Sequence, residues 1–319
     1  MMKDSNNPEK ELNILQRIGL ELLWATCRVM NYSPRWFRYY IFKPFVYCLL
    51  RLLRYRRKVI IKNLTLCFPD YTPKERKRIM RRYYHTLAEV IVDTICLAGA
   101  TPKRDGKCIN WSNGKEHLER IKGKDWVALA SHFGCWEYDL LWTWQDPDST
   151  FMGVYHTMRS EVFECFYRRL RNFSPSIAQV PMRETVRYYM KHRGQGRNIT
   201  LGLISDQSPL LTVDTAWYDF FGQPTAFVDG GERIAMKYSL PVYFVYVKRI
   251  AAGRYDIRFD ELYDGHEDVE PHEITRRYAK ALEAMIRETP ELWLWSHNRW
   301  RHTPAKQEAL KEKVKKGKI

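Results

Sequence analysis

SHFGCWE, at residues 131–137, comes directly after the apolar run WVALA at residues 126–130. A short apolar run with such bounds predicts a buried strand, and the apolar residues that follow Glu137 predict a helix. The imidazole of His132 is therefore expected at the carboxyl end of a strand, followed by a turn-forming Gly134 and a carboxylate. Open α/β sheets bind their ligands at these strand ends. The stretch thus predicts both an α/β fold and the place of its functional site.

His132 and Glu137 lie five positions apart, a spacing that does not put two side chains on one face of a helix. Gly134 can turn the chain between them because it lacks a Cβ atom. In that arrangement His132 would take the proton of a hydroxyl that attacks an acyl carbon. Glu137 would bind the other ring nitrogen and stabilise the imidazolium. The structural alternative is a packed histidine and an exposed carboxylate at a helix start.

The charge balance and the cysteines indicate the kind of partner and the redox state to expect. The 319 residues include 53 Lys and Arg against 37 Asp and Glu, a net charge of +16. Such an excess favours a polyanionic partner, which is a nucleic acid, an anionic membrane or a phosphorylated substrate. The seven cysteines form no C-x-x-C pair, which favours reduced thiols over a disulfide framework or a zinc site. Cys135 next to His132 could form a Cys–His nucleophile, but side chains so close in sequence rarely meet across a turn.

Nucleotide motifs are missing from the sequence. It contains no G-x-x-x-x-G-K-[ST] phosphate loop, and Gly194-Gln195-Gly196 lacks the rest of a dinucleotide fingerprint. We therefore expect no metal and no cofactor in the site.

Residues 13–55 are rich in apolar and aromatic side chains that are edged with Lys and Arg. Pro44 is expected to interrupt any continuous helix here. The pattern favours helices that lie in a membrane interface, and a pair of ordinary core helices is the alternative. No run reaches the roughly 18 uncharged apolar residues that a spanning helix needs, and no cleavable signal peptide is recognisable. We predict shallow insertion.

Further strands and helices complete the expected domain. Strands are predicted at 151–155, 199–205 and 241–247, with an edge strand at 255–259 and a short one at 109–111. Helices are predicted at 73–97, 115–122, 160–172, 183–192, 232–238 and around 274–285, whereas 209–229 reads as a long loop. The order predicts a single α/β domain with a mixed central β-sheet flanked by helices. The Lys-rich residues 305–319 are expected to be mobile.

Two other groups of polar residues follow predicted strands. Arg168, Arg169 and Arg171 could hold phosphate or carboxylate, or they could form a solvated helix face. Asp206 and Gln207 end the strand at 199–205, where they could orient the site, bind substrate or cap a turn.

Four blocks, in order from about residue 56 to residue 302, resemble one family. They are an Arg56-Arg57-Lys58 cluster followed by Asn63-Leu64 and Phe68-Pro69, the H-F-G-x-W-E motif with its H-x4-D/E spacing, Asp206-Gln207 with Phe220-Phe221-Gly222, and P-E-x-W-L-W-x-H-x-R at 290–299. This order is similar to the late acyltransferases of lipid A biosynthesis, the lauroyl and myristoyl transferases of the lysophospholipid acyltransferase superfamily. Phe227-Val228-Asp229 before Gly230-Gly231 departs from the family's pattern after F-F-G.

The resemblance implies a glycerol-phosphate-acyltransferase-like fold and a specific reaction. It divides the chain into an N-terminal membrane-associated helical segment (1–55), an acyltransferase domain (56–304) and a basic C-terminal tail (305–319). An acyl chain would pass from an acyl-carrier-protein thioester to a hydroxyl of a lipid A precursor, at the cytoplasmic face of the bacterial inner membrane. His132 would be the general base and Glu137 would orient it. Substrate-binding residues would be Arg169 (the best match for the family's arginine), Arg171, Asp206 and Gln207.

Three alternatives remain open. An enzyme with the same chemistry could acylate another membrane lipid, such as a lysophospholipid, an amino-acid lipid or a glycolipid. A basic nucleic-acid-binding protein would explain the charge and the aromatic residues, although no nucleic-acid motif supports it. A catalytically dead membrane scaffold is a third option, against which the intact His132 and Glu137 argue.

Overall fold

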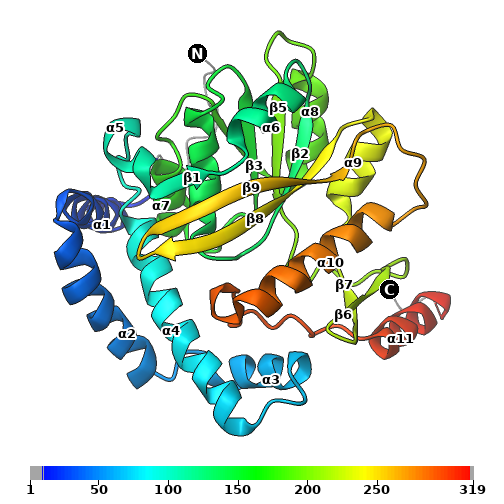
Figure 1. Ribbon diagram of the computed structural model, residues 1–319, viewed down its shortest axis with the longest axis horizontal. Coiled ribbons are helices and arrows are strands. Elements are labelled where there is room, and N and C mark those ends of the chain that lie inside the picture. The colour runs from blue at the N-terminus through cyan, green and yellow to red at the C-terminus, as the bar shows by residue number, and fades with distance from the viewer. Residues whose placement is uncertain (1–8, 10, 317–319) are drawn as a thin grey trace.

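The computed structural model describes residue 9 and residues 11–316, and within them a seven-stranded sheet forms the centre (Figure 1). The strand order is β1-β9-β8-β2-β5-β3-β4. The strands are β1 (Ile109–Trp111), β2 (Trp126–Ala130), β3 (Thr150–Tyr155), β4 (Ile177–Pro181), β5 (Ile199–Ile204), β8 (Val242–Ala251) and β9 (Arg254–Tyr263). Neighbouring strands run parallel except β8 and β9, which are antiparallel. The predicted single α/β domain with a mixed sheet is confirmed.

Helices cover both faces of this sheet. The helices are α1 (Ile14–Tyr32), η2 (Phe37–Phe42), α2 (Lys43–Leu52), α3 (Arg57–Cys67), α4 (Pro73–Ile95), α5 (Pro102–Asp105), η3 (Gly106–Cys108), α6 (Gly114–Ile121), η4 (Trp136–Trp144), α7 (Glu161–Leu170), η5 (Met182–Glu184), α8 (Thr185–His192), α9 (Gly230–Tyr238), α10 (Glu273–Glu288), η6 (Pro290–Leu292) and α11 (Pro304–Lys315). On one face Gly231 of α9 packs closely against Leu129 and Leu203, and on the other Leu140 of η4 lies over Gly153. Because side chains alternate along a strand, these contacts leave β2 and β5 buried on both sides.

Four predicted features differ in the structure. The strand predicted at the edge, β9, is an inner strand because the three-residue β1 pairs beyond it. Its alternation reflects one buried face and one accessible face, which an inner strand can also have. The loop at 209–229 contains the hairpin β6 (Trp217–Phe220) and β7 (Gln223–Ala226).

The predicted mobile tail is the third difference, since residues 304–315 form the helix α11. Its buried Gln307 accepts a hydrogen bond from the indole of Trp217 and donates to the carbonyls of Thr212, Val213 and Thr215. The hydrogen bonds of this one buried amide therefore hold α11 against residues 212–217. Residues 317–319, the end of the predicted tail, lie outside the described residues, as do 1–8 and 10 of the predicted N-terminal segment.

Pro44 does not break the chain into separate helices, contrary to the prediction. The preceding six residues form the π-helix η2, in which Lys43 N donates to the carbonyl of Arg38, five residues earlier. The wider turn accommodates a proline ring, and Pro44 stands in the first turn of α2, where its missing N–H is tolerated. The helical backbone therefore continues without a break from η2 into α2.

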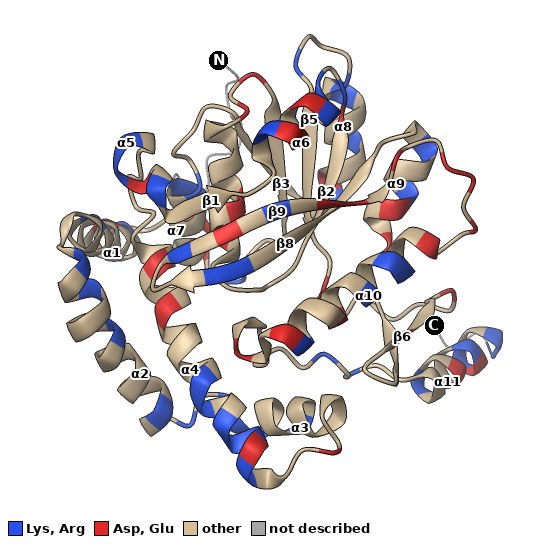
Figure 2. Ribbon diagram, in the orientation of Figure 1, with Lys and Arg blue, Asp and Glu red and all other residues tan. Residues whose placement is uncertain are grey.

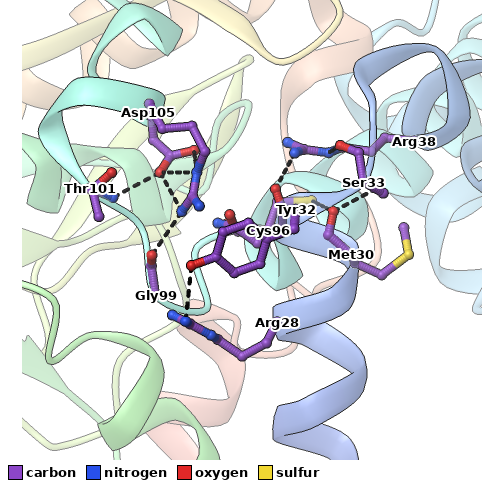
Figure 3. A network of polar contacts seen from close by, with 11 residues as sticks. Arg28, Met30, Tyr32, Ser33, Arg38, Cys96, Gly99, Thr101 and Asp105 are labelled. Atoms are coloured by element: carbon purple, nitrogen blue, oxygen red, sulfur yellow. Dashed lines mark hydrogen bonds and ion pairs between the residues drawn. The ribbon is translucent and has the colours of Figure 1, made fainter.

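The N-terminal helices are tied to the α/β domain by polar contacts (Figure 3). At the end of α1 the carbonyl of Met30 accepts a hydrogen bond from the thiol of Cys96, just after α4, and the guanidinium of Arg104 lies over the ring of Tyr32 at 4.7 Å. Within α4, Glu89 binds both Lys43 of α2 and Arg249 of β8. These contacts fix which sides of α1 and α2 face the domain.

The opposite sides of α1, η2 and α2 are apolar and accessible. The exposed side chains there are Ile14, Leu15, Ile18, Leu22, Val29, Tyr32, Trp36, Tyr40, Ile41, Phe45, Leu49, Leu52 and Leu53, which we call the N-terminal apolar face. Lys and Arg residues lie along α2 and the first half of α4 (Figure 2). Among the described residues, no helix has both the length and the apolar character needed to cross a bilayer.

The buried Asp93 of α4 is expected to make the stability of the protein depend on pH. Its buried carboxylate accepts hydrogen bonds from Tyr39 of η2 and Tyr255 of β9, at 2.6 and 3.3 Å. Burial raises its pKa to about 7, and repulsion by Glu89 adds to this. In the unfolded chain the pKa of this carboxyl group is near its ordinary value of 3.8, so the folded state keeps a proton that the unfolded state loses. Stability is therefore expected to fall as pH rises toward 7 and to level off above it.

Between pH 5 and pH 8 this carboxyl group should cost about 3 kcal/mol of unfolding free energy. Chemical denaturation at both pH values measures the difference, and Asp93→Asn should flatten it. Equal pH dependence in the wild type and the variant would contradict the assignment.

Candidate active site

His132 is held between the end of β2 and the segment after η6. The amide of Gly134 donates to the carbonyl of Leu292 at 2.9 Å, and the amide of Leu294 donates to the carbonyl of His132 at 3.0 Å. Gly134 has a φ of +58°, and a Cβ atom there would come within 2.7 Å of the Tyr255 ring. Glycine is therefore required for both the turn and the packing. The loop that carries His132 is fixed by this short ladder to the C-terminal segment.

The carboxylate that binds the His132 ring belongs to Asp206. His132 Nδ1 lies 2.7 Å from Asp206 Oδ1, and the His132 amide donates to Oδ2 at 3.0 Å. The two residues meet because β2 and β5 are parallel neighbours with Ala130 opposite Ile204, so both chains leave the sheet at one edge. A carboxylate only accepts hydrogen bonds, so Nδ1 carries the proton and Nε2 keeps its lone pair.

Asp206 is 2 % exposed, and its surroundings favour the charged form. Burial by itself would raise the pKa of Asp206, but the His132 ring, the indole of Trp293 and the His132 amide together bring this pKa below its ordinary value. Trp293 Nε1 donates to Oδ2 at 2.8 Å. The dyad therefore combines a fixed carboxylate with an imidazole that is 18 % exposed.

Gln207 lies against the ring of the imidazole. Its side-chain Nε2 is 3.2 Å from His132 Nε2 and 3.4 Å from His132 Nδ1. The ring of Trp136 packs edge-on against the imidazole at 4.9 Å between centroids. A substrate hydroxyl that binds His132 Nε2 would therefore lie close to the Gln207 amide.

The structure pairs Glu137 with Arg171 and not with the ring of His132, which differs from the arrangement predicted from spacing. Both of its carboxylate oxygens accept hydrogen bonds from Arg171, at 2.8 and 2.6 Å. The pair is buried, with the Glu137 side chain 4 % and the Arg171 side chain 18 % exposed. Glu137 stands in the first turn of the helix η4, and its carboxylate meets the guanidinium of Arg171, just after the end of α7. Its charge is thus neutralised by the arginine two residues after Arg169.

Arg169, predicted as the best match for a substrate-binding arginine, points to the N-terminal helix. It pairs with Glu21 of α1 at 2.8 Å and with Glu9 at 3.3 Å, and its guanidinium lies over the ring of Trp24. Arg171, the second choice, lines the cavity described next. The two side chains diverge because positions two apart on a helix face different directions.

A cavity of about 520 Å³ extends from His132 along one face of the sheet. Its inner wall is mainly aromatic and aliphatic, and its lining includes Trp111, Leu140, Trp142, Phe151, Val245 and Phe259. Accessible residues that include Met158, Met182, Leu210 and Arg301 line its outer end. A largely apolar cavity of this size is typical of a site for a small molecule or a lipid chain.

Three small residues make room for this cavity. Ala128 of β2, Gly202 of β5 and Gly153 of β3 are opposite one another in adjacent strands and all line it. A Cβ atom on Gly202 would come within 2.4 Å of the Phe151 ring. Sequence reasoning did not find this row, since only the strand register makes the three residues neighbours. The available signal was a small residue in the middle of each predicted strand.

Two further residues near His132, Trp293 and Cys135, can be compared with what the sequence indicated. The role of Trp293 was missed because the sequence motif gave no sign that its indole reaches Asp206. Cys135 is 3 % exposed, and burial raises the pKa of its thiol well above the ordinary value. An inert buried thiol does not act as a nucleophile. The site can therefore supply a base for a substrate hydroxyl beside an apolar cavity.

Comparisons with known proteins identify the family of the chain. The family model described as bacterial lipid A biosynthesis acyltransferase matches residues 6–302. Among solved structures, the chain is similar to the 1-acyl-sn-glycerophosphate (LPA) acyltransferase PlsC from Thermotoga maritima, with a TM-score of 0.34 and 13 % sequence identity over 88 % of this chain and 99 % of that one. No curated protein matches the chain. On the family match over nearly its whole length, the chain belongs to the bacterial lipid A biosynthesis acyltransferases.

Proposed function

We propose that this protein transfers a fatty acyl chain from an acyl-carrier-protein thioester to a hydroxyl of a lipid A precursor. Family membership makes it an acyltransferase that acts on lipid. The observation that supports the reaction most directly is the His132–Asp206 pair beside a largely apolar cavity. The acyl chain would occupy the cavity and the acceptor hydroxyl would meet His132 Nε2.

The reaction then needs only the substrate's own nucleophile. His132 Nε2 takes the hydroxyl proton while the oxygen attacks the thioester carbonyl carbon. The tetrahedral intermediate collapses as its carbon–sulfur bond breaks, and the imidazolium returns the proton to the departing thiolate. Asp206 stabilises the imidazolium between these steps without taking its proton. The products are an ester and a free thiol, so atoms and charge balance.

The basic surface supports the choice of substrates. The chain has a net charge of +16, and Arg301 lies among the accessible residues at the outer end of the cavity. Cations attract an acidic carrier protein and the phosphates of a lipid A precursor. A different acceptor, such as a lysophospholipid, an amino-acid lipid or a glycolipid, would use the same base and cavity.

Mass spectrometry tests the reaction. Purified protein is incubated with an acyl-carrier-protein thioester and a tetra-acylated, Kdo-bearing lipid A precursor, beside a His132→Ala control. One added acyl mass with the wild type and none with the control is expected. If no mass is added to this acceptor but a lipid in a total bacterial extract is acylated, the protein is an acyltransferase for a lipid other than a lipid A precursor. No transfer to any lipid would overturn the function.

The N-terminal apolar face would bring the enzyme to its lipid substrates. We propose that it lies in the cytoplasmic leaflet of the bacterial inner membrane, which is anionic. Exposed apolar and aromatic side chains suit the acyl boundary, while neighbouring Lys and Arg contact lipid phosphates. Insertion would be shallow, with the helices in the plane of the interface.

Vesicle binding should follow both parts of this arrangement. Leu52 and Leu53 are 81 % and 68 % exposed, so Leu52→Glu with Leu53→Glu should lower affinity for anionic vesicles at least tenfold by replacing two buried apolar contacts with charges. Neutral vesicles should bind the wild type more weakly. Val314→Glu, on α11, is the control and should have no effect. Co-sedimentation measures the affinities, and equal binding by both variants would place the anchor elsewhere.

A further inference from the structure

One wall of the cavity is the helix η4, which carries a polar group into it. A 3₁₀ helix has three residues per turn, so Trp136, Asp139 and Trp142 lie on one side. All three line the cavity. Trp136 touches the His132 ring, and the rise of a 3₁₀ helix places Asp139 about 6 Å farther along the wall. Asp139 therefore belongs to the interior of the cavity, one turn away from the base.

The carboxyl group of Asp139 lacks a partner there. Its Oδ1 is buried and has no hydrogen bond among the described residues. The neighbouring acid Glu137 differs, because Arg171 satisfies both of its oxygens. Burial raises the pKa of Asp139 well above its ordinary value, and the charge of Glu137 adds to the shift. These surroundings favour the neutral form of the Asp139 carboxyl group, which can both donate and accept a hydrogen bond.

A second unpaired group lies on the same side of the helix. The indole Nε1 of Trp142 is buried and also has no hydrogen-bond partner in the described part of the chain. An unpaired buried polar group destabilises a protein unless a ligand or water satisfies it. Two such groups along one wall of an otherwise largely apolar cavity indicate that its ligand carries a polar substituent.

We propose that the cavity binds an aliphatic chain that bears a hydroxyl group, and that this hydroxyl pairs with Asp139. The inference rests on the proposed function only in taking the cavity as the site of a lipid chain. A hydroxyl donates one hydrogen bond and accepts others, which matches a neutral carboxyl group. A charged substituent would lose its hydration among aromatic and aliphatic side chains without a compensating ion.

This hydroxyl is distinct from the one that reacts. The reacting hydroxyl must meet His132 Nε2, whereas Asp139 lies a helical turn away along η4. The hydroxylated chain can be the acyl group of the donor or an acyl chain of the acceptor lipid, because both present the same chemistry. Separate arms of the experiment distinguish them.

Binding can be measured without turnover, because Trp111, Trp136 and Trp142 line the cavity and report occupancy by their fluorescence. The probes are tetradecanoic acid and its hydroxy derivatives, with the hydroxyl moved from carbon 3 toward the middle of the chain. One derivative should bind the wild type at least tenfold more tightly than the plain acid. Asp139→Asn, which keeps hydrogen-bonding atoms, should retain most of the preference, and Asp139→Leu should abolish it. Circular dichroism confirms that both variants fold.

An identical ratio of affinities in the wild type and Asp139→Leu, for every derivative, would overturn the proposal. The transfer assay is then run with a hydroxylated donor and a plain acceptor, and with the reverse pair. The arm whose rate depends on Asp139 identifies which chain carries the hydroxyl. Transfer with no hydroxyl preference in either arm would reject the Asp139 site and keep the acyltransferase. An Asp139-dependent preference in binding, with no transfer to any lipid, would support the site and reject the proposed function.

Discussion

Asp206→Asn is expected to lower kcat/KM for acyl transfer by roughly 10³–10⁴-fold while the protein stays folded. An asparagine amide can place an N–H group opposite His132 Nδ1, where the carboxylate now accepts. The imidazole would then keep its proton on Nε2 and offer its lone pair at Nδ1. In that tautomer Nε2 cannot take a proton from the acceptor hydroxyl.

The matched control is Asp214→Asn, which makes the same chemical change at an exposed position in the loop before β6. It should leave kcat/KM unchanged. Steady-state transfer, followed by mass spectrometry, measures both variants, and circular dichroism checks their fold. An Asp206→Asn enzyme within tenfold of the wild type would show that the carboxylate next to His132 is not needed to set its tautomer.

Arg171→Leu is expected to lower the free energy of unfolding by about 3–5 kcal/mol. The substitution leaves Glu137, whose side chain is 4 % exposed, without the two hydrogen bonds that compensate its charge. The double variant with Glu137→Leu removes both charges and should recover much of the loss, because well-packed apolar pairs often replace buried ion pairs at little cost. Chemical denaturation measures all three proteins.

Arg169→Leu is the control for this series, since it deletes an arginine two residues away. Its partner Glu21 is 61 % exposed, and such surface pairs contribute about 0–1 kcal/mol. The variant should therefore be nearly as stable as the wild type. Equal destabilisation by Arg169→Leu and Arg171→Leu would contradict the different roles that the structure gives these two arginines. The double variant Glu137→Leu/Arg171→Leu also tests the predicted catalytic role of Glu137. If it folds but loses as much activity as Asp206→Asn, Glu137 is needed for catalysis.

Local patterns in the sequence predicted most of the fold. The apolar runs at 126–130 and 199–205 had the length of buried strands, and Thr72 with Glu75 forms the capping box that starts α4. The hairpin β6–β7 and the strand β4 were not predicted. Their segments are short, and pairing with a distant strand stabilises them more than local propensity does.

The sequence by itself determined the α/β class, the position of His132 at a strand end and the family to which the chain belongs. These properties depend on neighbouring residues and on the order of motifs, which the chain carries in one dimension. Tertiary structure decided which carboxylate serves His132, because Asp206 is 74 residues away and reaches the ring only through the pairing of β2 with β5. It likewise assigned Arg171 to Glu137 and brought Ala128, Gly153 and Gly202 into one row. Distances between side chains far apart in sequence are set by strand register and helix packing, and no local pattern encodes them.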